Sequence, residues 1–159
     1  MTRDELKQRV DEAIERHADE IVTVGEAIRR HPELGFKERK TAALVETKFR
    51  ELGLSARTGL ALTGVRADAI GGAGPGPTFA LLGELDGLVV AGHPDADPST
   101  GAVHACGHNA QIAGLVGAAI GLVKAKALER LAGSAPTRSS VTASVARRGT
   151  APAPRTWAI

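Results

Sequence analysis

The segment HACGHN at positions 104–109 places two imidazoles and one thiol within five residues. Thiolates and imidazoles are both ligands of first-row transition metals. Gly107 separates Cys106 from His108 and lets the backbone turn so that both side chains can face one point. A predicted helix begins directly after them, and its N-terminus favours the thiolate over the thiol. Cys106 and His108 therefore have the residue types and the spacing of a pair of metal ligands, and His104 is close enough to join or support them.

Other interpretations of this segment stay open at the level of sequence. Cys106 is the only cysteine of the chain, and a lone cysteine in a cytoplasmic protein is often a small buried hydrophobic residue. A C-x-H pattern alone is a weak indication of metal. A cysteine-protease site is less favoured, because it needs a histidine base placed by the fold and nothing else in the sequence indicates a nucleophile.

Two carboxylates follow a predicted strand in the segment GELDGL. Asp86 ends this strand, and the carboxyl ends of strands form ligand sites in α/β proteins. In a metal site Asp86 would orient a ligating histidine; the alternative is an ordinary loop aspartate that caps a turn. Glu84 points to the same face and has the same two interpretations. Residues 31–38, HPELGFKE, are interpreted as a helix-to-helix connection with Phe36 packed into the core.

Helical periodicity predicts the elements that position these residues. Thr2 and Glu5 form a capping box, and apolar residues then recur every three or four positions to Ile28, which predicts one long amphipathic helix. A second helix is predicted from about Arg39 to Leu52. The third follows HACGHN, and its apolar face consists of Ile112, Leu115, Val116, Ala119, Ile120 and Val123. On another side it carries Gly114, Gly117 and Gly121, which would allow a neighbouring element to approach closely.

Strand patterns lie between the second and third predicted helices. Val65, Ala67 and Ala69 alternate with other residues, which predicts a strand with one buried face. Residues 71–77, GGAGPGP, form a turn or loop, and residues 78–82, TFALL, predict a buried strand. The order of elements indicates an α/β domain with helices packed on a mixed sheet.

The composition changes at Ser134. Residues 134–159 contain four Arg and no Lys, Asp, Glu or His, and no hydrophobic period continues there. Such a segment buries too little apolar surface to offset its ordering entropy, so we expect disorder. We divide the chain into residues 1–133, the folded part, and residues 134–159, a disordered tail that we hypothesise to be an out-of-frame product.

Charge and hydropathy argue against nucleic-acid binding and against a membrane span. The formal net charge is +2, and without the four tail arginines it is −2, so the body carries no basic footprint for nucleic acid. No apolar run reaches the roughly 18 residues that a membrane span needs. The charged N-terminus is not a targeting peptide. We expect a protein of the cytoplasm that binds neither nucleic acid nor membrane.

Three segments together resemble a known family. RRHPELGFKE, GELDGL and HPDADPSTGAVHACGHNAQ, in this order, resemble the M20 metallopeptidases and amidohydrolases, in the aminoacylase-like branch that includes aminobenzoyl-glutamate and hippurate hydrolases. The resemblance runs from about residue 10 to about residue 130. It implies an incomplete zinc-peptidase-like domain, in which Cys106 and His108 bind metal and Asp86 is the carboxylate that orients a metal-binding group.

The resemblance also implies an activity. One or two divalent ions, zinc or manganese, would activate water and polarise the amide carbonyl of an N-acyl amino acid or a dipeptide-like substrate. In the family a glutamate of a Glu-Glu pair after the last helix is the general base, more ligands follow, and a second domain often forms a homodimer. Residues 134–159 hold none of these groups, so we expect this chain to be truncated and inactive alone. The alternative is a non-catalytic fragment or partner-binding module without hydrolase activity.

Overall fold

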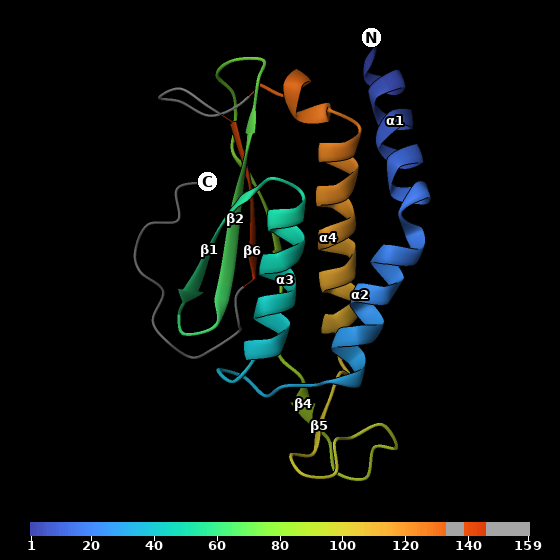
Figure 1. Ribbon diagram of the computed structural model, residues 1–159, viewed down its shortest axis with the longest axis vertical. Helices are drawn as coiled ribbons and strands as arrows, with labels where there is room; N and C mark the ends of the chain where they lie inside the picture. The colour runs from blue at the N-terminus through green and yellow to red at the C-terminus, as the bar shows by residue number, and fades with distance from the viewer. Residues whose placement is uncertain (133–138, 146–159) are drawn as a thin grey trace.

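The computed structural model describes residues 1–132 and 139–145. In Figure 1 the helices lie on one side of a twisted sheet, and a two-stranded ribbon lies at one end of the molecule. The helices are α1 (Arg3–Arg16), α2 (Ala18–Arg30), α3 (Arg39–Glu51), α4 (His108–Lys124) and the short 3-10 helix η1 (Ala127–Arg130). The strands are β1 (Ser55–Leu60), β2 (Gly64–Gly71), β3 (Phe79–Gly83), β4 (Leu88–Val89), β5 (Ala102–Val103) and β6 (Ser139–Val145).

The main sheet is mixed. Its strand order is β1-β2-β6-β3. β1 and β6 both pair antiparallel with β2, whereas β3 pairs parallel with β6. The ribbon β4-β5 is antiparallel and lies where β3 and α4 approach the same end of the fold. The predicted α/β class with helices on a mixed sheet is confirmed.

Strand β6 lies inside the segment for which the sequence predicted disorder. Ser139–Val145 pair with both β2 and β3, with Val141 opposite Ala69 on one side and Phe79 on the other. The physical reason is that the main-chain N–H and C=O groups of β2 and β3 need hydrogen-bond partners, which the main chain of any extended segment can supply. Hydrophobic periodicity in the sequence does not reveal this pairing. Valine and threonine within the segment also favour extended backbone. The remaining residues of the predicted tail lie outside the described residues.

The predicted long first helix is two helices, which corrects the expectation. Its start is as predicted: Thr2 and Glu5 form a capping box, with Glu5 N donating to Thr2 Oγ1 at 3.2 Å. The helix is interrupted at His17, which has φ −112° and ψ 16°. The ring nitrogen Nδ1 of His17 contacts the carbonyl oxygen of Ala13 at 2.8 Å, so the side chain competes for that main-chain acceptor.

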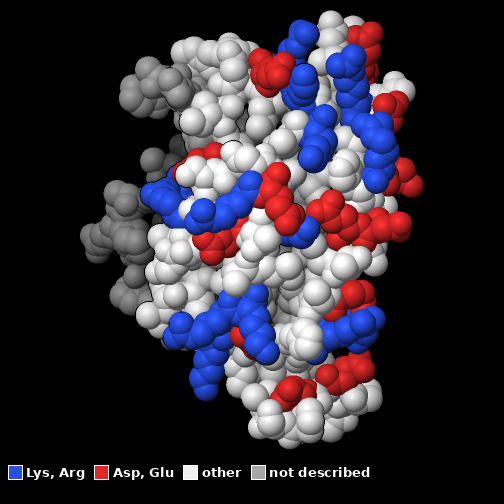
Figure 2. Space-filling model, in the orientation of Figure 1, with Lys and Arg blue, Asp and Glu red and all other residues white. Residues whose placement is uncertain are grey.

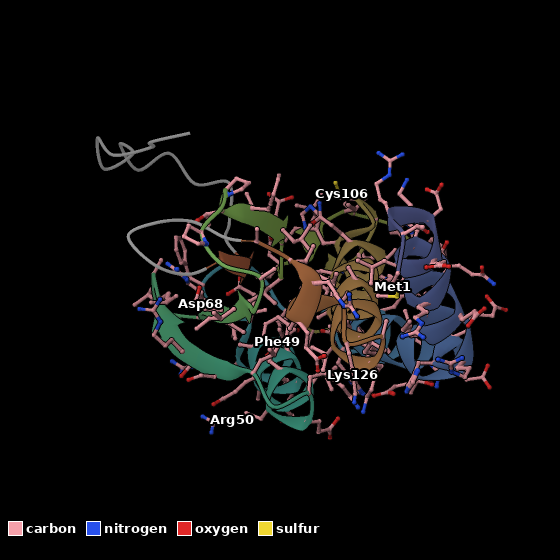
Figure 3. All side chains as sticks on the ribbon, turned by 90° about the horizontal axis from the view of Figure 1, so that it is seen from above. Met1, Phe49, Arg50, Asp68, Cys106 and Lys126 are labelled. Atoms are coloured by element: carbon pink, nitrogen blue, oxygen red, sulfur yellow. The ribbon has the colours of Figure 1, made fainter. Side chains whose placement is uncertain are left out.

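The core forms between the helices and the sheet. Val45 and Phe49 of α3 are fully buried, and α3 is followed by Gly53 with φ +74°. In Figure 3 Phe49 lies between α3 and the sheet. The alternating residues of β2 are buried as predicted. The buried core residues are Val24, Ile28, Val45, Phe49, Val65, Ala67, Leu85, Ile112, Leu115, Val116, Ala119 and Ile120.

Helix α4 is central and is approached closely by α1 and α2. A Cβ built on Gly117 would lie 3.1 Å from Ile21 Cδ1, and one built on Gly121 would lie 2.8 Å from Ile14 Cγ1. A Cβ on Gly114 would meet nothing within 4 Å. The predicted role of the glycines is therefore confirmed for Gly117 and Gly121, and Gly114 faces open space.

Two predictions of burial are wrong. Phe36, expected in the core, is 45% exposed and has φ +64°. The main chain turns sharply between α2 and α3, and this directs the ring outward. Residues 78–82 were expected to form a buried strand, but Phe79 is 65% exposed and Leu82 is 58% exposed. β3 is the last strand in the sheet order, so it lacks a strand neighbour on its outer side among the described residues.

The surface helices carry charges of both signs. In the view of Figure 2 acidic and basic side chains alternate over the helical face. Several form ion pairs one helical turn apart, such as Arg29 with Glu26 and Arg50 with Glu46. Within the residues described, no helix is both long and apolar enough to cross a bilayer.

Candidate functional site

Strand β3 delivers two carboxylates to the N-terminal end of α4. The strand ends at Gly83, where a Cβ would lie 2.8 Å from Ile112 Cδ1, so any other residue would have to displace the end of the Ile112 side chain. Glu84 then donates its main-chain N–H to Gln111 Oε1 at 2.7 Å. Leu85 is buried in the core. Glu84 and Asp86 therefore emerge on the same side of the chain beside α4.

The loop between β5 and α4 carries His104 and Cys106 and brings His108 to the two carboxylates. His104 follows β5, and its carbonyl oxygen accepts the main-chain N–H of Gly107 at 3.1 Å. Gly107 has φ +86°, a left-handed conformation that costs little only for glycine. This turn makes His108 the first residue of α4.

His108 lies between the two carboxylates. Its Nδ1 is 2.8 Å from the main-chain oxygen of Asp86 and 3.2 Å from Asp86 Oδ1. Because a carbonyl oxygen can only accept, Nδ1 is the donor of this hydrogen bond. Nε2 is 2.9 Å from Glu84 Oε2. The structure therefore brings Asp86 and His108 together, with Asp86 fixing the orientation of the ring.

His104 is buried without a partner. It is 8% exposed, and neither ring nitrogen has a hydrogen-bond partner among the described residues. Burial lowers the pKa of His104 below its usual value, the charge of nearby His108 lowers it further, and Asp86 opposes the shift. An unpaired buried polar group costs about 1–3 kcal/mol. His104 is thus an imidazole that the described fold does not use for its own stability.

Cys106 is exposed rather than buried. Figure 3 shows it at the periphery of the molecule, away from the core around Phe49. The alternative in which Cys106 is a small buried hydrophobic residue is therefore wrong. The thiol lies two residues before His108 in the turn that starts α4.

The side chains around His108 include the donor types that metal ions take. Thiol, imidazole and carboxylate are the donors that divalent transition metals take, and the orphaned ring nitrogens of His104 add unused donors nearby. Within residues 1–132 and 139–145, no group of three or more His, Cys, Asp or Glu is arranged to hold an ion as it stands. The residues therefore fit a metal ion in kind, but the described residues do not form a ligand set by themselves.

Residues 31–38 hold the turn after Asp86 in place through main-chain contacts, a role that the sequence did not reveal. The main-chain oxygen of Glu33 accepts from Gly87 N at 2.7 Å, and Leu34 forms a bridge with Gly87. The Glu33 carboxylate accepts from Thr41 N at 2.9 Å at the start of α3. This segment therefore ties the turn after Asp86 to two helices. Gln111 was also missed as a support, because its partner lies 27 residues away in sequence.

Known proteins resemble this chain over most of its length. It is 34% identical over 127 residues to thermostable carboxypeptidase 1 of Saccharolobus solfataricus, covering 78% of this chain and 32% of that relative. It is 35% identical over 103 residues to N-acetyl-L-cysteine deacetylase of Bacillus subtilis, covering 63% of this chain and 24% of that relative. The crystal structure of Bacillus subtilis YXEP, a dinuclear metal-binding peptidase from the M20 family, matches with a TM-score of 0.67 and 24% identity over 82% of this chain and 35% of that chain. No family model matches the sequence.

The chain has the fold of this M20 peptidase and is similar in sequence to the carboxypeptidase and the deacetylase. These likenesses support the resemblance inferred from HACGHN and GELDGL, and they confirm the predicted fold. The chain spans about a third or less of the length of these relatives. The roles of Asp86, Cys106 and His108 within the M20 site are proposals, which follow from the geometry described above.

Proposed function

We propose that the cluster at the start of α4 is part of the active site of a metal-dependent M20 amidohydrolase. The substrate class is an N-acyl or N-aminoacyl amino acid, and the bond cleaved is its amide. One relative is named an N-acetyl-L-cysteine deacetylase and another a carboxypeptidase, and both names describe hydrolysis beside an amino acid. Their chemistry supports this assignment of substrate class.

The observation that carries the proposal is the position of His108. Asp86 engages Nδ1 through its main-chain oxygen at 2.8 Å, so Nε2 is the nitrogen that a metal would take, in place of its present contact with Glu84 Oε2 at 2.9 Å. This is the arrangement in which a metal-binding histidine donates its other nitrogen to an oxygen acceptor. The exposed thiol of Cys106 lies two residues before His108 in the sequence, and the left-handed Gly107 separates the two residues.

Each residue has a distinct role in this proposal. Cys106 and His108 are metal ligands, and Asp86 is a positioning residue that holds the His108 ring. The metal is zinc or manganese, with two ions in a complete site. When bound, the ions lower the pKa of water and polarise the substrate carbonyl.

Turnover requires groups that residues 134–159 do not provide, because that segment contains no Glu, Asp or His. The family's Glu-Glu pair would supply the general base that takes the proton of the attacking water. We therefore propose that these 159 residues bind metal but do not hydrolyse substrate alone, and that a complete enzyme acts in the cytoplasm as a homodimer.

Metal binding and amino acid release test the proposal separately. Purified chain is titrated with Zn²⁺ or Mn²⁺ by calorimetry, and the loaded protein is incubated with N-acetyl amino acids while free amino acid is measured. We expect binding that is lost in Cys106→Ser and His108→Ala and kept in His31→Ala, a control that removes an exposed imidazole from the α2 terminus. Binding unchanged in both ligand variants would contradict the assignment, and turnover by the chain alone would contradict the requirement for further groups.

The exposed residues of β3 favour a second candidate, a partner-binding module without hydrolase activity. Phe79 is 65% exposed and Leu82 is 58% exposed on the strand that ends the sheet order. Edge strands with apolar side chains pair readily with other chains. Light scattering on a size-exclusion column tests this candidate: self-association that Leu82→Lys abolishes, in a chain that binds no metal, would favour it over the hydrolase.

A further inference from the structure

We infer that Glu33 is a positioning residue of this site, which acts on His108 through the peptide group between Asp86 and Gly87. The inference rests on the proposed function, because it concerns the histidine that is assigned there to a metal ion. It begins from two hydrogen bonds made by one peptide group. The Asp86 carbonyl oxygen accepts from His108 Nδ1 at 2.8 Å, and the Gly87 N–H donates to the Glu33 carbonyl oxygen at 2.7 Å.

This peptide group transmits orientation from one hydrogen bond to the other. Its atoms lie in one plane, so the direction of the Gly87 N–H fixes the direction of the Asp86 C=O. Hydrogen bonds in such a chain also polarise one another, so the bond to Glu33 makes the Asp86 oxygen a stronger acceptor for Nδ1. A stronger acceptor at Nδ1 raises the basicity of Nε2, which is the nitrogen that a metal would take.

Close packing leaves the peptide group little freedom to turn. A Cβ built on Gly87 would lie 3.1 Å from the Val103 carbonyl oxygen and 3.2 Å from Pro32 Cβ. The two residues joined at the ring, Asp86 and His108, are each 8% exposed, so little water competes for their hydrogen bond. The orientation of the ring is therefore set by the protein around the peptide group.

The Glu33 carboxylate anchors its own main chain to the start of α3. Oε1 accepts from Lys40 N at 3.1 Å, and Oε2 accepts from Thr41 N at 2.9 Å and from Thr41 Oγ1 at 3.0 Å. Within the described part of the chain, Glu38 at the N-cap of α3 makes no capping hydrogen bond with its side chain. The first turn of α3 therefore takes its acceptor from Glu33, and the helix dipole strengthens the attraction to this carboxylate. Glu33 thus joins α3 to the peptide group that orients His108.

Hydrogen exchange followed by NMR tests the inference in the 159-residue chain without added metal. The protons measured are the Gly87 amide and the His108 Nδ1 proton, each relative to the amide of fully buried Val116 in α4. Glu33→Ala removes the anchor, and Glu33→Gln keeps the side-chain length with one acceptor oxygen. Glu5→Gln is the matched control. Glu5 also accepts a main-chain N–H at the start of a helix, at the end of the molecule opposite the β4-β5 ribbon (Figure 1).

We expect both protons to exchange at least about tenfold faster in Glu33→Ala relative to Val116, because hydrogen bonds to a charged acceptor are lost. The resonance of the His108 Nδ1 proton should also move upfield. Glu33→Gln should lie between Glu33→Ala and the wild type, and Glu5→Gln should match the wild type.

Three results would overturn the inference. Faster exchange of Gly87 with an unchanged Nδ1 proton would show that Glu33 holds the loop but not the ring. Acceleration that Val116 shares in full would show a general loss of stability. A wild-type Nδ1 proton that exchanges too fast to be observed would show that the peptide group does not hold His108.

Glu33→Gln decides the question if Glu33→Ala does not fold, and an Nδ1 proton unchanged in Glu33→Gln would then contradict the inference. Because no metal is added, a failure of metal binding would contradict the proposed function without altering these outcomes.

Discussion

Two glycines of α4 provide a matched pair of substitutions with opposite expected effects. At Gly121 a Cβ would lie 2.8 Å from Ile14 Cγ1 and 3.0 Å from Val10 Cγ1, so alanine forces α1 and α4 apart. At Gly114 a Cβ would meet nothing within 4 Å, so alanine fits without movement. Both positions are in the interior of the same helix. The comparison isolates the packing of α1 on the helix that carries His108.

The magnitudes follow from two opposing terms. Replacing glycine by alanine in a helix interior stabilises the fold by about 1 kcal/mol at either position. Overpacking at a tight contact costs about 1–3 kcal/mol. Gly114→Ala should therefore raise the free energy of unfolding by up to about 1 kcal/mol. Gly121→Ala should be less stable than Gly114→Ala by about 1–3 kcal/mol.

Urea unfolding followed by circular dichroism measures this difference. The m-values of the two variants should agree, because unfolding exposes nearly the same surface area in both. Equal midpoints for Gly121→Ala and Gly114→Ala would refute the close packing of α1 on α4. The same result would remove the reason for glycine at Gly121.

Three further predictions concern the site and its loops. Burial lowers the pKa of His104, so below about pH 6.5 the unfolded chain binds more protons than the folded chain, and the free energy of unfolding falls as the pH drops. In urea titrations His104→Leu should flatten the pH dependence of this free energy between about pH 7 and pH 5. An unchanged slope would contradict the burial of His104 without a partner. Hydrogen bonds from Ser99 and Thr100 lower the pKa of Asp97 to about 2. The amide chemical shifts of residues 93–101 should therefore stay constant until the pH falls through that value, and an Asp97 that titrates near about 4 by NMR would contradict this prediction. Gly107→Ala should cost about 1–2 kcal/mol, because φ is +86° there, and should weaken metal binding by displacing His108; wild-type affinity would show that the turn does not position the ring.

Local signals predicted the helices well. The capping box at Thr2 and Glu5 and the apolar face of α4 depend on residues three or four positions apart, and the structure contains both. The break at His17 was not predictable in this way, because hydrophobic periodicity continues through it. The exposure of Phe36 and Phe79 depends on the direction of a turn and on the place of β3 in the sheet, and both are set by distant parts of the chain.

The candidate site was likewise predictable only in part from the sequence. Cys106, His108 and Asp86 were selected by residue type and spacing, and the structure places Asp86 against the His108 ring. The contact of Glu84 with that ring was not predictable, because it requires β3 to approach α4 at Gly83, where a Cβ would clash with Ile112. The unpartnered burial of His104 is likewise a property of the packed loop and has no counterpart in a sequence pattern.

X-ray absorption at the zinc edge tests the central claim most directly, since it reports the atoms bonded to the metal. The zinc-loaded chain should show one sulfur at about 2.3 Å and nitrogen or oxygen at about 2.0–2.1 Å, and Cys106→Ser should lose the sulfur. A first shell of nitrogen and oxygen alone in the wild-type chain would contradict the assignment of Cys106 and His108 as a metal-binding pair.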